Sequence, residues 1–498
     1  MAARALRIED NPRSENWQIR TLPRCRRGSF KDLQRLSSRE ICWRGAERQV
    51  ICWLRRITHA FPRCSIRGQT REPVNMNRRN ISRLLVTVFW GISVLDVSAN
   101  GFGLASQDAF ATGRGEAFAA TADNASAIYY NPAGITQITG TSLRSGLYSI
   151  YIDPTFEPPN TAANAGQTYS TGKHYNFIPQ LFLVHSFENS PVSVGLGVYA
   201  PYGGNMDWPQ DTGFRAVATS GSLKYFRVNP VIAFKLFPQL SIGGGVMVDY
   251  AKIDLEQGLS ALPQPPNFYR FTGDGWSVGY NLGVLWQPIK QISLGATFRS
   301  ETAFTMHGHT EFEKYSSGIA YTSLPAHADY TFPIAAAFGL SYRPTPKWNL
   351  EFDADYNDWG SFGTVTLYQQ GTPPPGGPQN PVLILDWQPS WMYEFGVTRY
   401  FDNGWHVSAG YVYNQTSVPD AYYSPLAADL DRHFFSVGAG YKGARFDCDI
   451  AYQFGYGPAH TVTGSTPSSI SGTIAGQNAN GTYDFISQAV FVTVGMHF

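Results

Sequence analysis

Residues 348–357 read Trp-Asn-Leu-Glu-Phe-Asp-Ala-Asp-Tyr-Asn, and this stretch decides the fold class. Apolar side chains, from Trp348 to Tyr356, alternate with polar ones, from Asn349 to Asn357. Successive side chains of a β-strand point to opposite faces, so one face of this strand is apolar and the other carries acids. Acids at every second position must face water. Since the other face suits lipid, the alternation predicts a strand of a membrane barrel with the water inside.

A second stretch, Tyr330–Tyr342, has the length and the ends of a membrane-spanning strand. Its apolar face begins and ends on a tyrosine and includes Phe332 and Phe338. Aromatic residues at both ends of a long alternating strand are typical of the girdles that flank the apolar band of a transmembrane barrel. About fourteen such stretches follow residue 140, an even number as in single-chain bacterial barrels. They lie near residues 141–153, 173–187, 191–201, 222–237, 239–256, 272–287, 291–306, 326–344, 347–367, 381–401, 404–416, 431–442, 444–460 and 483–498.

The connections between these stretches alternate in length. Short turns such as 188–190 and 402–404 alternate with long loops rich in Gly, Pro and Asn, among them 307–325. An even strand number with both ends in the periplasm produces short periplasmic turns and long outer loops. The chain ends on an aromatic residue, Phe498, which we expect the outer-membrane assembly machinery to bind. Residues 141–498 are therefore predicted to form an all-β, antiparallel transmembrane barrel of about 14 strands in the bacterial outer membrane.

The first 99 residues have a different composition. Residues 1–75 are rich in Arg and hold four of the five cysteines, whose spacing matches neither a zinc nor a redox motif. Residues 76–99 combine a basic start, an apolar run from Leu84 to Ile92 and the small residues Val97-Ser98-Ala99, which is the layout of a signal peptide. Because signal peptides are N-terminal, we expect translation to begin at Met76 and residues 1–75 to be non-structural. An extended basic leader is the alternative.

Composition excludes several classes of protein. A net charge of +1 gives no electrostatic basis for binding nucleic acid. The mean hydropathy is −0.22, and no run after residue 99 approaches about 18 apolar residues, which excludes membrane-spanning helices. A barrel whose strands have one lipid-facing side and one polar side accounts for both the low mean hydropathy and the short apolar runs. Cys448, the single cysteine after the signal peptide, is predicted to point into lipid, where a thiol behaves as a small hydrophobic group.

Residues 100–140, between the signal peptide and the barrel, show no strand alternation and are rich in Gly, Ala, Ser and Asn. A segment of small residues joined to a long β array predicts a plug inside the lumen. Within it, Gly101-Phe102, Gly113-Arg114-Gly115-Glu116-Ala117 and Asn131-Pro132-Ala133 resemble the FadL/TodX family of outer-membrane transporters of long-chain fatty acids and aromatic hydrocarbons. An Asn-Pro pair also starts a turn, which is compatible with a place in the plug.

The resemblance implies a passive, ligand-gated channel for hydrophobic molecules that needs no cofactor. It also implies a capture groove in the outer loops, a deeper site lined partly by the N-terminus, and a lateral exit through a kinked third strand. In that strand Gly195, Gly197 and Pro201 are the candidates for the kink, since Pro lacks a ladder donor and Gly weakens pairing. Phe102 is the candidate ligand contact from the plug, because an aromatic residue amid Gly and Ala has no local core to join.

Two arginines, Arg227 and Arg299, fall at inward positions well above the periplasmic end of their strands. The forked donor set of Arg suits the head group of a fatty acid. Neutralisation of acids in the lumen wall is the alternative. Two rival functions share the barrel: a general polar-solute porin, which would lack the plug, and a structural or adhesin barrel, which would carry nothing. We expect the protein to be a monomer surrounded by outer-membrane lipid.

Possible catalytic and metal-binding groups have a simpler interpretation. Asp353 with Asp355, and Asp447 with Asp449, have a spacing that could suit a carboxylate-pair hydrolase. We favour a polar lumen wall as their explanation, because barrel interiors are ordinarily polar. His307-Gly308-His309 falls in a predicted outer loop without a third ligand. We therefore predict no enzyme activity, no catalytic site and no metal site, and expect the acids to be balanced by Arg227, Lys235, Arg299, Arg343 and Arg445.

Overall fold

The computed structural model describes residues 101–498 with short gaps, together with residues 6–7 and 20–21. The chain divides into two compact units, Met1–Leu85 and Val86–Phe498. In the first unit β1 (Leu6–Arg7) pairs with β2 (Arg20–Thr21). The predicted signal peptide and the rest of residues 1–75 lie outside the described residues. The gaps in the second unit fall at residues 173, 262–266, 315–316, 376, 378 and 467–476.

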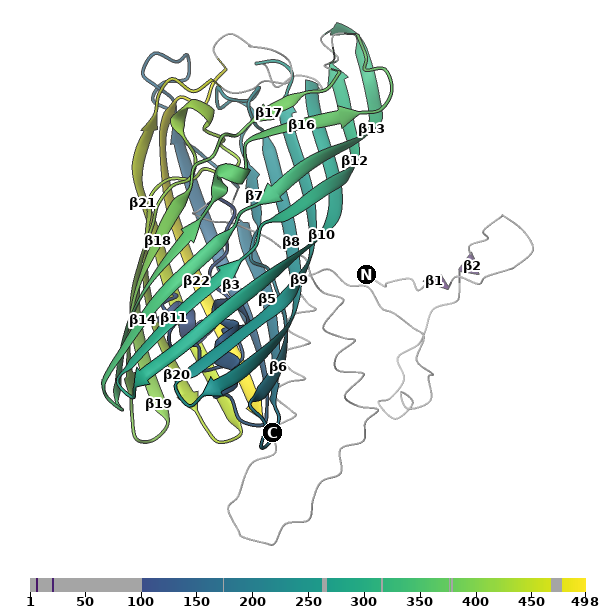
Figure 1. Ribbon diagram of the computed structural model, residues 1–498. Helices are drawn as coiled ribbons and strands as arrows, with labels where there is room; N and C mark the ends of the chain where they lie inside the picture. The colour runs from purple at the N-terminus through teal and green to yellow at the C-terminus, as the bar shows by residue number, and fades with distance from the viewer. Residues whose placement is uncertain are drawn as a thin grey trace, which may run out of the picture. The chain divides into compact units, whose positions relative to one another are not determined.

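The second unit is a closed antiparallel barrel of 14 strands, as predicted (Figure 1). It begins at β3 (Thr141–Glu157), ends at β22 (Gly481–His497), and closes where these two strands pair. Several strands are interrupted and carry two labels for one crossing of the wall. The strands between are β4 (Tyr169–Ser170), β5 (His174–Ser186), β6 (Val192–Tyr199), β7 (Gly204–Asp207), β8 (Ser220–Phe237), β9 (Leu240–Gly258), β10 (Asn267–Ile289), β11 (Ile292–Arg299), β12 (Thr302–Lys314), β13 (Ile319–Phe332), β14 (Ala335–Thr345), β15 (Trp348–Asn357), β16 (Thr364–Gln369), β17 (Val382–Ile384), β18 (Ser390–Tyr400), β19 (Trp405–Asn414), β20 (Arg432–Lys442) and β21 (Phe446–Val462).

The alternation that predicted the barrel separates its two faces. In β15, Trp348 and Leu350 are exposed on the outer face, whereas Glu351 and Asp353 are buried inside. Cys448 of β21 is also exposed, on the face opposite the buried acids beside it, as predicted. Exposed apolar side chains on every crossing are what lipid contact requires.

Two sequence-based expectations about strand ends are wrong. Residues 307–325 were expected to form a long loop, but β12 continues to Lys314 and β13 resumes at Ile319. Alternation persists there, with Met306 buried and His307 exposed, although the outward side chains become polar. Polar outward residues end the lipid-facing band but do not end backbone pairing, so hydropathy alone placed the strand end too early. Residues 191–201 were expected to be one strand; β6 instead ends at Tyr199.

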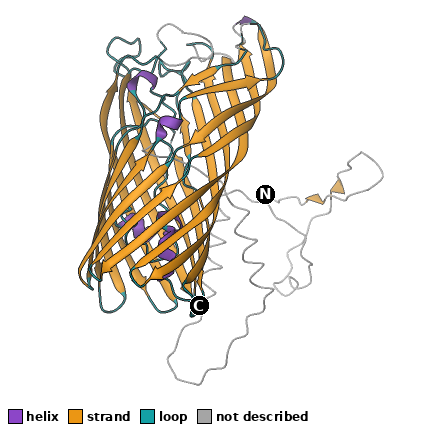
Figure 2. Ribbon diagram, viewed as in Figure 1, coloured by secondary structure: helices purple, strands orange, loops and turns teal. Residues whose placement is uncertain are grey.

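Residues 101–140, here called the N-terminal segment, lie inside the barrel toward the end that holds the C-terminus (Figure 2). They form α3 (Ala109–Gly113), α4 (Ala127–Tyr130) and the 3-10 helix η2 (Pro132–Gln137), and most of their side chains are buried. Asp108 begins α3 by accepting hydrogen bonds from the first backbone N–H groups of the helix. Two further 3-10 turns, η4 (Trp359–Ser361) and η5 (Asp420–Tyr422), belong to connections between strands. In the part of the chain that the structure describes, no helix has the length and hydrophobicity to cross a membrane.

Candidate functional site

Carboxylates of the inner wall hold the backbone of the N-terminal segment. Glu351 accepts hydrogen bonds from the backbone N–H groups of residues 120 and 121, at 2.8 and 2.9 Å. Asp353 accepts from those of residues 118 and 119, at 2.8 and 2.7 Å. Arg114 of the segment adds an ion pair with Glu351 at 3.0 Å. The expectation that these alternating acids face water is therefore wrong, because protein donors replace the water.

Glycines of the inner wall provide the room that the N-terminal segment occupies. A Cβ at Gly410 would overlap the backbone of Arg114 and Gly115, and a Cβ at Gly295 would overlap Ala119. These contacts bring the backbone of the segment directly against the backbone of the wall, which only a residue without a side chain allows. The wall glycines whose Cβ would meet the backbone of the segment are Gly243, Gly295, Gly339, Gly396, Gly410 and Gly438.

A buried ion cluster attaches the N-terminal segment near the C-terminal end of the barrel. Arg144 of β3 forms ion pairs with Asp108 of the segment, with Asp447 at 2.9 Å and with Asp449 at 2.6 Å. His406 of β19 contacts Asp449 at 2.7 Å. The cluster therefore joins the segment to three strands of the wall, β3, β19 and β21.

The counter-charges of these acids differ from the predicted ones. Lys235 and Arg445 are exposed, so they do not balance buried acids. Arg343 lies 3.7 Å from Asp123 of the N-terminal segment. Arg144, which does balance them, was not recognised from the sequence. It reaches Asp447 because β3 pairs with β22 and β22 with β21, and barrel closure between the first and last strands leaves no local signal.

The motif Asn131-Pro132-Ala133 forms the predicted turn. Asn131 caps η2, its side chain accepting from the backbone N–H of Ala133 at 3.2 Å. Its amide nitrogen donates to the carbonyl oxygens of Ala119, at 2.8 Å, and of Val284 in β10, at 3.0 Å. One buried side chain thus joins two parts of the N-terminal segment to the wall.

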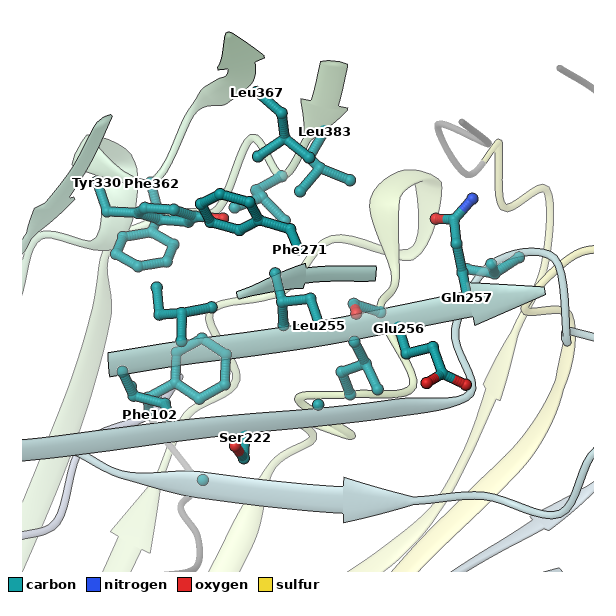
Figure 3. Close-up of a pocket in the computed structure, with 18 of the residues that line it drawn as sticks. Phe102, Ser222, Leu255, Glu256, Gln257, Phe271, Tyr330, Phe362, Leu367 and Leu383 are labelled. Carbon is teal, nitrogen blue, oxygen red and sulfur yellow. The ribbon is translucent and has the colours of Figure 1, made fainter. Parts of the chain in front are cut away.

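Above this segment lies an apolar cavity of about 110 Å³ (Figure 3). Phe102 of the N-terminal segment lines it together with side chains of the wall and of the outer connections. The ring of Phe102 packs 5.2 Å from that of Trp387 and 6.2 Å from that of Phe362, measured between centroids. The lining residues include Phe102, Leu223, Ile253, Leu255, Tyr269, Phe271, Tyr330, Phe332, Phe362, Leu367, Leu383, Leu385, Trp387 and Leu426.

Next to Phe102, the third crossing of the wall is interrupted between β6 and β7. The backbone N–H of Leu104 donates to the carbonyl of Pro201 at 2.8 Å, and that of Gly203 donates to the carbonyl of Phe102 at 2.9 Å. The N-terminal segment therefore pairs with the interruption. The ladder between β5 and β6 ends at Leu181, which lies opposite Val198.

Of the three residues proposed for a kink, only Pro201 lies in this interruption. Gly195 and Gly197 sit in the regular part of β6, paired with β5 on one side and β8 on the other, and so lie outside the interruption. A Cβ at either position would lie 2.8 to 2.9 Å from the side chain of Ile128. These glycines make room for the N-terminal segment and do not weaken the wall.

The two candidate arginines line a second, smaller cavity of about 50 Å³. Arg227 is engaged by Asp249, with Nε donating to Oδ1 at 2.7 Å and Nη2 to Oδ2 at 2.8 Å. Arg299 donates to the carbonyl of Tyr129 at 2.7 Å and lies 4.3 Å from the centroid of its ring. Pro201 lines the same cavity, which places both arginines beside the interrupted strand.

A family model described as outer membrane protein transport protein (OMPP1/FadL/TodX) matches residues 93–498. The chain belongs to this family. Its barrel accordingly lies in the bacterial outer membrane.

Within the described residues, no three His, Cys, Asp or Glu side chains come together as metal ligands. His307 and His309 lie in strand β12, outside the loop expected for them.

Curated relatives cover most of this FadL/TodX family chain. A long-chain fatty acid transport protein of Escherichia coli O6:H1 is 23% identical over 416 residues, which span 75% of this chain and 89% of that protein. A putative outer membrane protein of Neisseria meningitidis serogroup B is 24% identical over 412 residues, 74% of this chain and 88% of its own length.

Solved structures of the FadL/TodX family share the fold. A Pseudomonas aeruginosa FadL homologue superposes with a TM-score of 0.68 at 19% identity, covering 80% of this chain and all of the other. The Pseudomonas putida toluene transporter TodX gives a TM-score of 0.60 at 15% identity, covering 80% of this chain and 99% of its own.

Proposed function

We propose that this protein takes up hydrophobic molecules through the outer membrane by passive, ligand-gated diffusion, with long-chain fatty acids or related hydrocarbons as the cargo class. The supporting observation is the apolar cavity, one wall of which is Phe102 of the N-terminal segment. A water-filled pore favours polar solutes, whereas an apolar cavity lets a hydrophobic solute leave water. Relatives named for fatty acid and toluene transport support the same cargo class.

The N-terminal segment is proposed to act as the plug and the gate. Phe102 lines the outer cavity, while Leu104 lines the second cavity and its backbone pairs with the interrupted third strand. A cargo molecule that displaces Phe102 from Trp387 would pull residues 102–104 away from residues 201–203. The cargo would then pass Arg299 and leave sideways into lipid, where the ladder between β5 and β6 stops. No cofactor or catalytic step enters this scheme.

The C-terminal residue is proposed as the contact for the assembly machinery. The backbones of Phe498 and Thr141 pair: the Thr141 N–H donates to the Phe498 carbonyl at 3.2 Å, and the Phe498 N–H donates to the Thr141 carbonyl at 2.9 Å. Phe498 is nevertheless 65% exposed. An exposed terminal ring is free to be recognised before the barrel closes. We propose that the finished barrel is a monomer in contact with outer-membrane lipid.

The uptake proposal is tested by two measurements on purified protein. Mild-detergent extraction followed by mass spectrometry is expected to find fatty acid or another hydrophobic molecule bound to the barrel. Liposomes that contain the protein are expected to swell slowly in sugars, because the N-terminal segment occupies the lumen. Rapid, size-limited sugar flux would favour a porin, and an empty cavity with no sugar flux would favour a structural barrel.

A further inference from the structure

The part of the apolar cavity's lining that the structure describes carries no positive charge. Its described lining residues include neither Lys, Arg nor His, and one acid, Glu256, lies at one end. Figure 3 shows Glu256 and Gln257 grouped at that end and Phe102, Tyr330 and Phe362 at the other. A buried carboxylate needs a cation or several hydrogen-bond donors, and a neighbouring acid repels it. An anionic head group therefore has no cationic partner among the described lining residues.

The same cavity contains polar groups that lack partners. Among the described residues, the Oη atom of Tyr330 and the Nε1 atom of Trp387 are buried without a hydrogen bond. Tyr330 is 4% exposed and Trp387 is 2% exposed, so bulk water does not satisfy them. Buried polar atoms are paired in most folded proteins, and each exception requires an explanation.

Both residues pack against Phe362, whose ring lies 6.0 Å from that of Tyr330 and 5.2 Å from that of Trp387, measured between centroids. Trp387 also contacts Phe102, which the proposed gate displaces. The indole N–H only donates, and a phenol O–H can donate as well, so the atom that satisfies them is an acceptor. The Nε2 atom of Gln257 is a third buried donor without a partner, at the opposite end.

We infer that the cavity selects an uncharged hydrophobic molecule with one hydrogen-bond-accepting oxygen, of the ketone, ester or ether class. The inference rests on the proposed uptake of hydrophobic molecules, and within that class it favours a neutral oxygenated molecule over fatty acids and pure hydrocarbons. A pure hydrocarbon fills the apolar walls but leaves Tyr330 and Trp387 unpaired. A carboxylate pairs with them but finds no cation among the described lining residues to offset its charge. A neutral oxygenated molecule meets both conditions.

The test compares three probes of similar size: acetophenone, a ketone; ethylbenzene, a hydrocarbon; and benzoate, an anion. Each is equilibrated by dialysis with the full barrel in lipid nanodiscs, and the amount bound to empty nanodiscs is subtracted. Acetophenone is expected to bind about fivefold more tightly than ethylbenzene, the ratio that one net hydrogen bond supplies. Benzoate is expected to bind most weakly.

Variants identify the groups responsible. Tyr330→Phe is expected to reduce the ratio of acetophenone affinity to ethylbenzene affinity. It is not expected to lower the unfolding temperature, since the hydroxyl it removes has no protein partner. Trp387→Phe is a second variant with the same expected loss of ratio. Tyr483→Phe is the matched control, because Tyr483 lies outside the cavity lining and its buried hydroxyl donates to the carbonyl of Ala479 at 2.9 Å. Its ratio is expected to equal that of the unmodified protein.

Three results would contradict these statements in different ways. Equal or tighter binding of ethylbenzene or benzoate would overturn the inference and leave the uptake proposal standing. A ketone preference that survives in both Tyr330→Phe and Trp387→Phe would also overturn it, since another donor or a bound water would then be responsible. Failure of all three probes to bind would overturn the inference, whereas the uptake proposal is contradicted only if extraction finds no hydrophobic molecule in the barrel.

Discussion

Phe102 is the residue on which the proposed gate depends. It is close to the start of the described chain, yet its ring is held by Trp359, Phe362 and Trp387, with centroids 5.2 to 6.5 Å away. Burial of an aromatic side chain contributes roughly 1.5–3 kcal/mol. That amount holds a terminal segment in place and still allows a hydrophobic ligand to displace it.

Phe102→Ala is expected to weaken cargo binding and slow uptake several-fold, because the cavity loses one wall and the gate loses its apolar contact. The barrel itself is expected to fold, since Phe102 contributes to no strand ladder. Binding to purified protein and the heat-modifiable mobility of the barrel on gels measure the two effects. Phe395→Ala, on the lipid-facing side, is the control. Unchanged uptake in Phe102→Ala would remove this residue from the gate.

At the scale of elements, β15 and the N-terminal segment form one unit. Glu351 and Asp353 each receive two backbone N–H groups of the segment, and Glu351 also pairs with Arg114. Hydrogen bonds to a charged acceptor contribute about 1.5–3 kcal/mol each. The segment is therefore attached through its backbone, which leaves its small side chains free to pack against the wall glycines.

The double variant Glu351→Gln with Asp353→Asn is expected to loosen this attachment. It keeps the shape of both side chains but removes their charges and leaves Arg114 without its counter-charge. Swelling of liposomes in small sugars is expected to become several-fold faster, because water gains a path past the segment. Asp402→Asn, at an exposed turn, is the control. Swelling as slow as that of the unmodified protein would show that these acids do not hold a plug closed.

At the scale of the whole molecule, the barrel has a lipid-facing outside and a protein-filled inside. Cys448 reports on this arrangement, because it is exposed between Phe446 and Ile450 while Asp447 and Asp449 on either side of it are buried. A strand slipped by one residue would exchange these faces.

Labelling of Cys448 in isolated outer membranes is expected to be slow with a charged maleimide and fast with a membrane-soluble one. A cysteine introduced at Asp402, whose side chain is 82% exposed at a turn, is expected to react quickly with the charged reagent. Equal, fast reaction of Cys448 with both reagents would contradict the inside-outside assignment of β21.

Local pattern was sufficient for the barrel. Alternation in stretches such as 348–357 depends only on the two-residue period of a strand, so the sequence by itself determined the fold class, the number of crossings and the outward position of Cys448. Its motifs also predicted a separate N-terminal segment with Phe102 as a ligand contact, and in the structure Phe102 lines an apolar cavity.

Only the tertiary structure decided which inward groups meet. Arg144 reaches Asp447 through barrel closure, Arg227 is engaged by Asp249, and the acids of β15 bind backbone rather than water. Gly195 and Gly197 leave room for the side chain of Ile128 in the N-terminal segment, whereas the sequence suggested that they form a kink. The physical reason is that hydropathy records whether a side chain leaves bulk water, but not which partner replaces that water. Partners are set by strand register and ring closure, which join residues hundreds of positions apart.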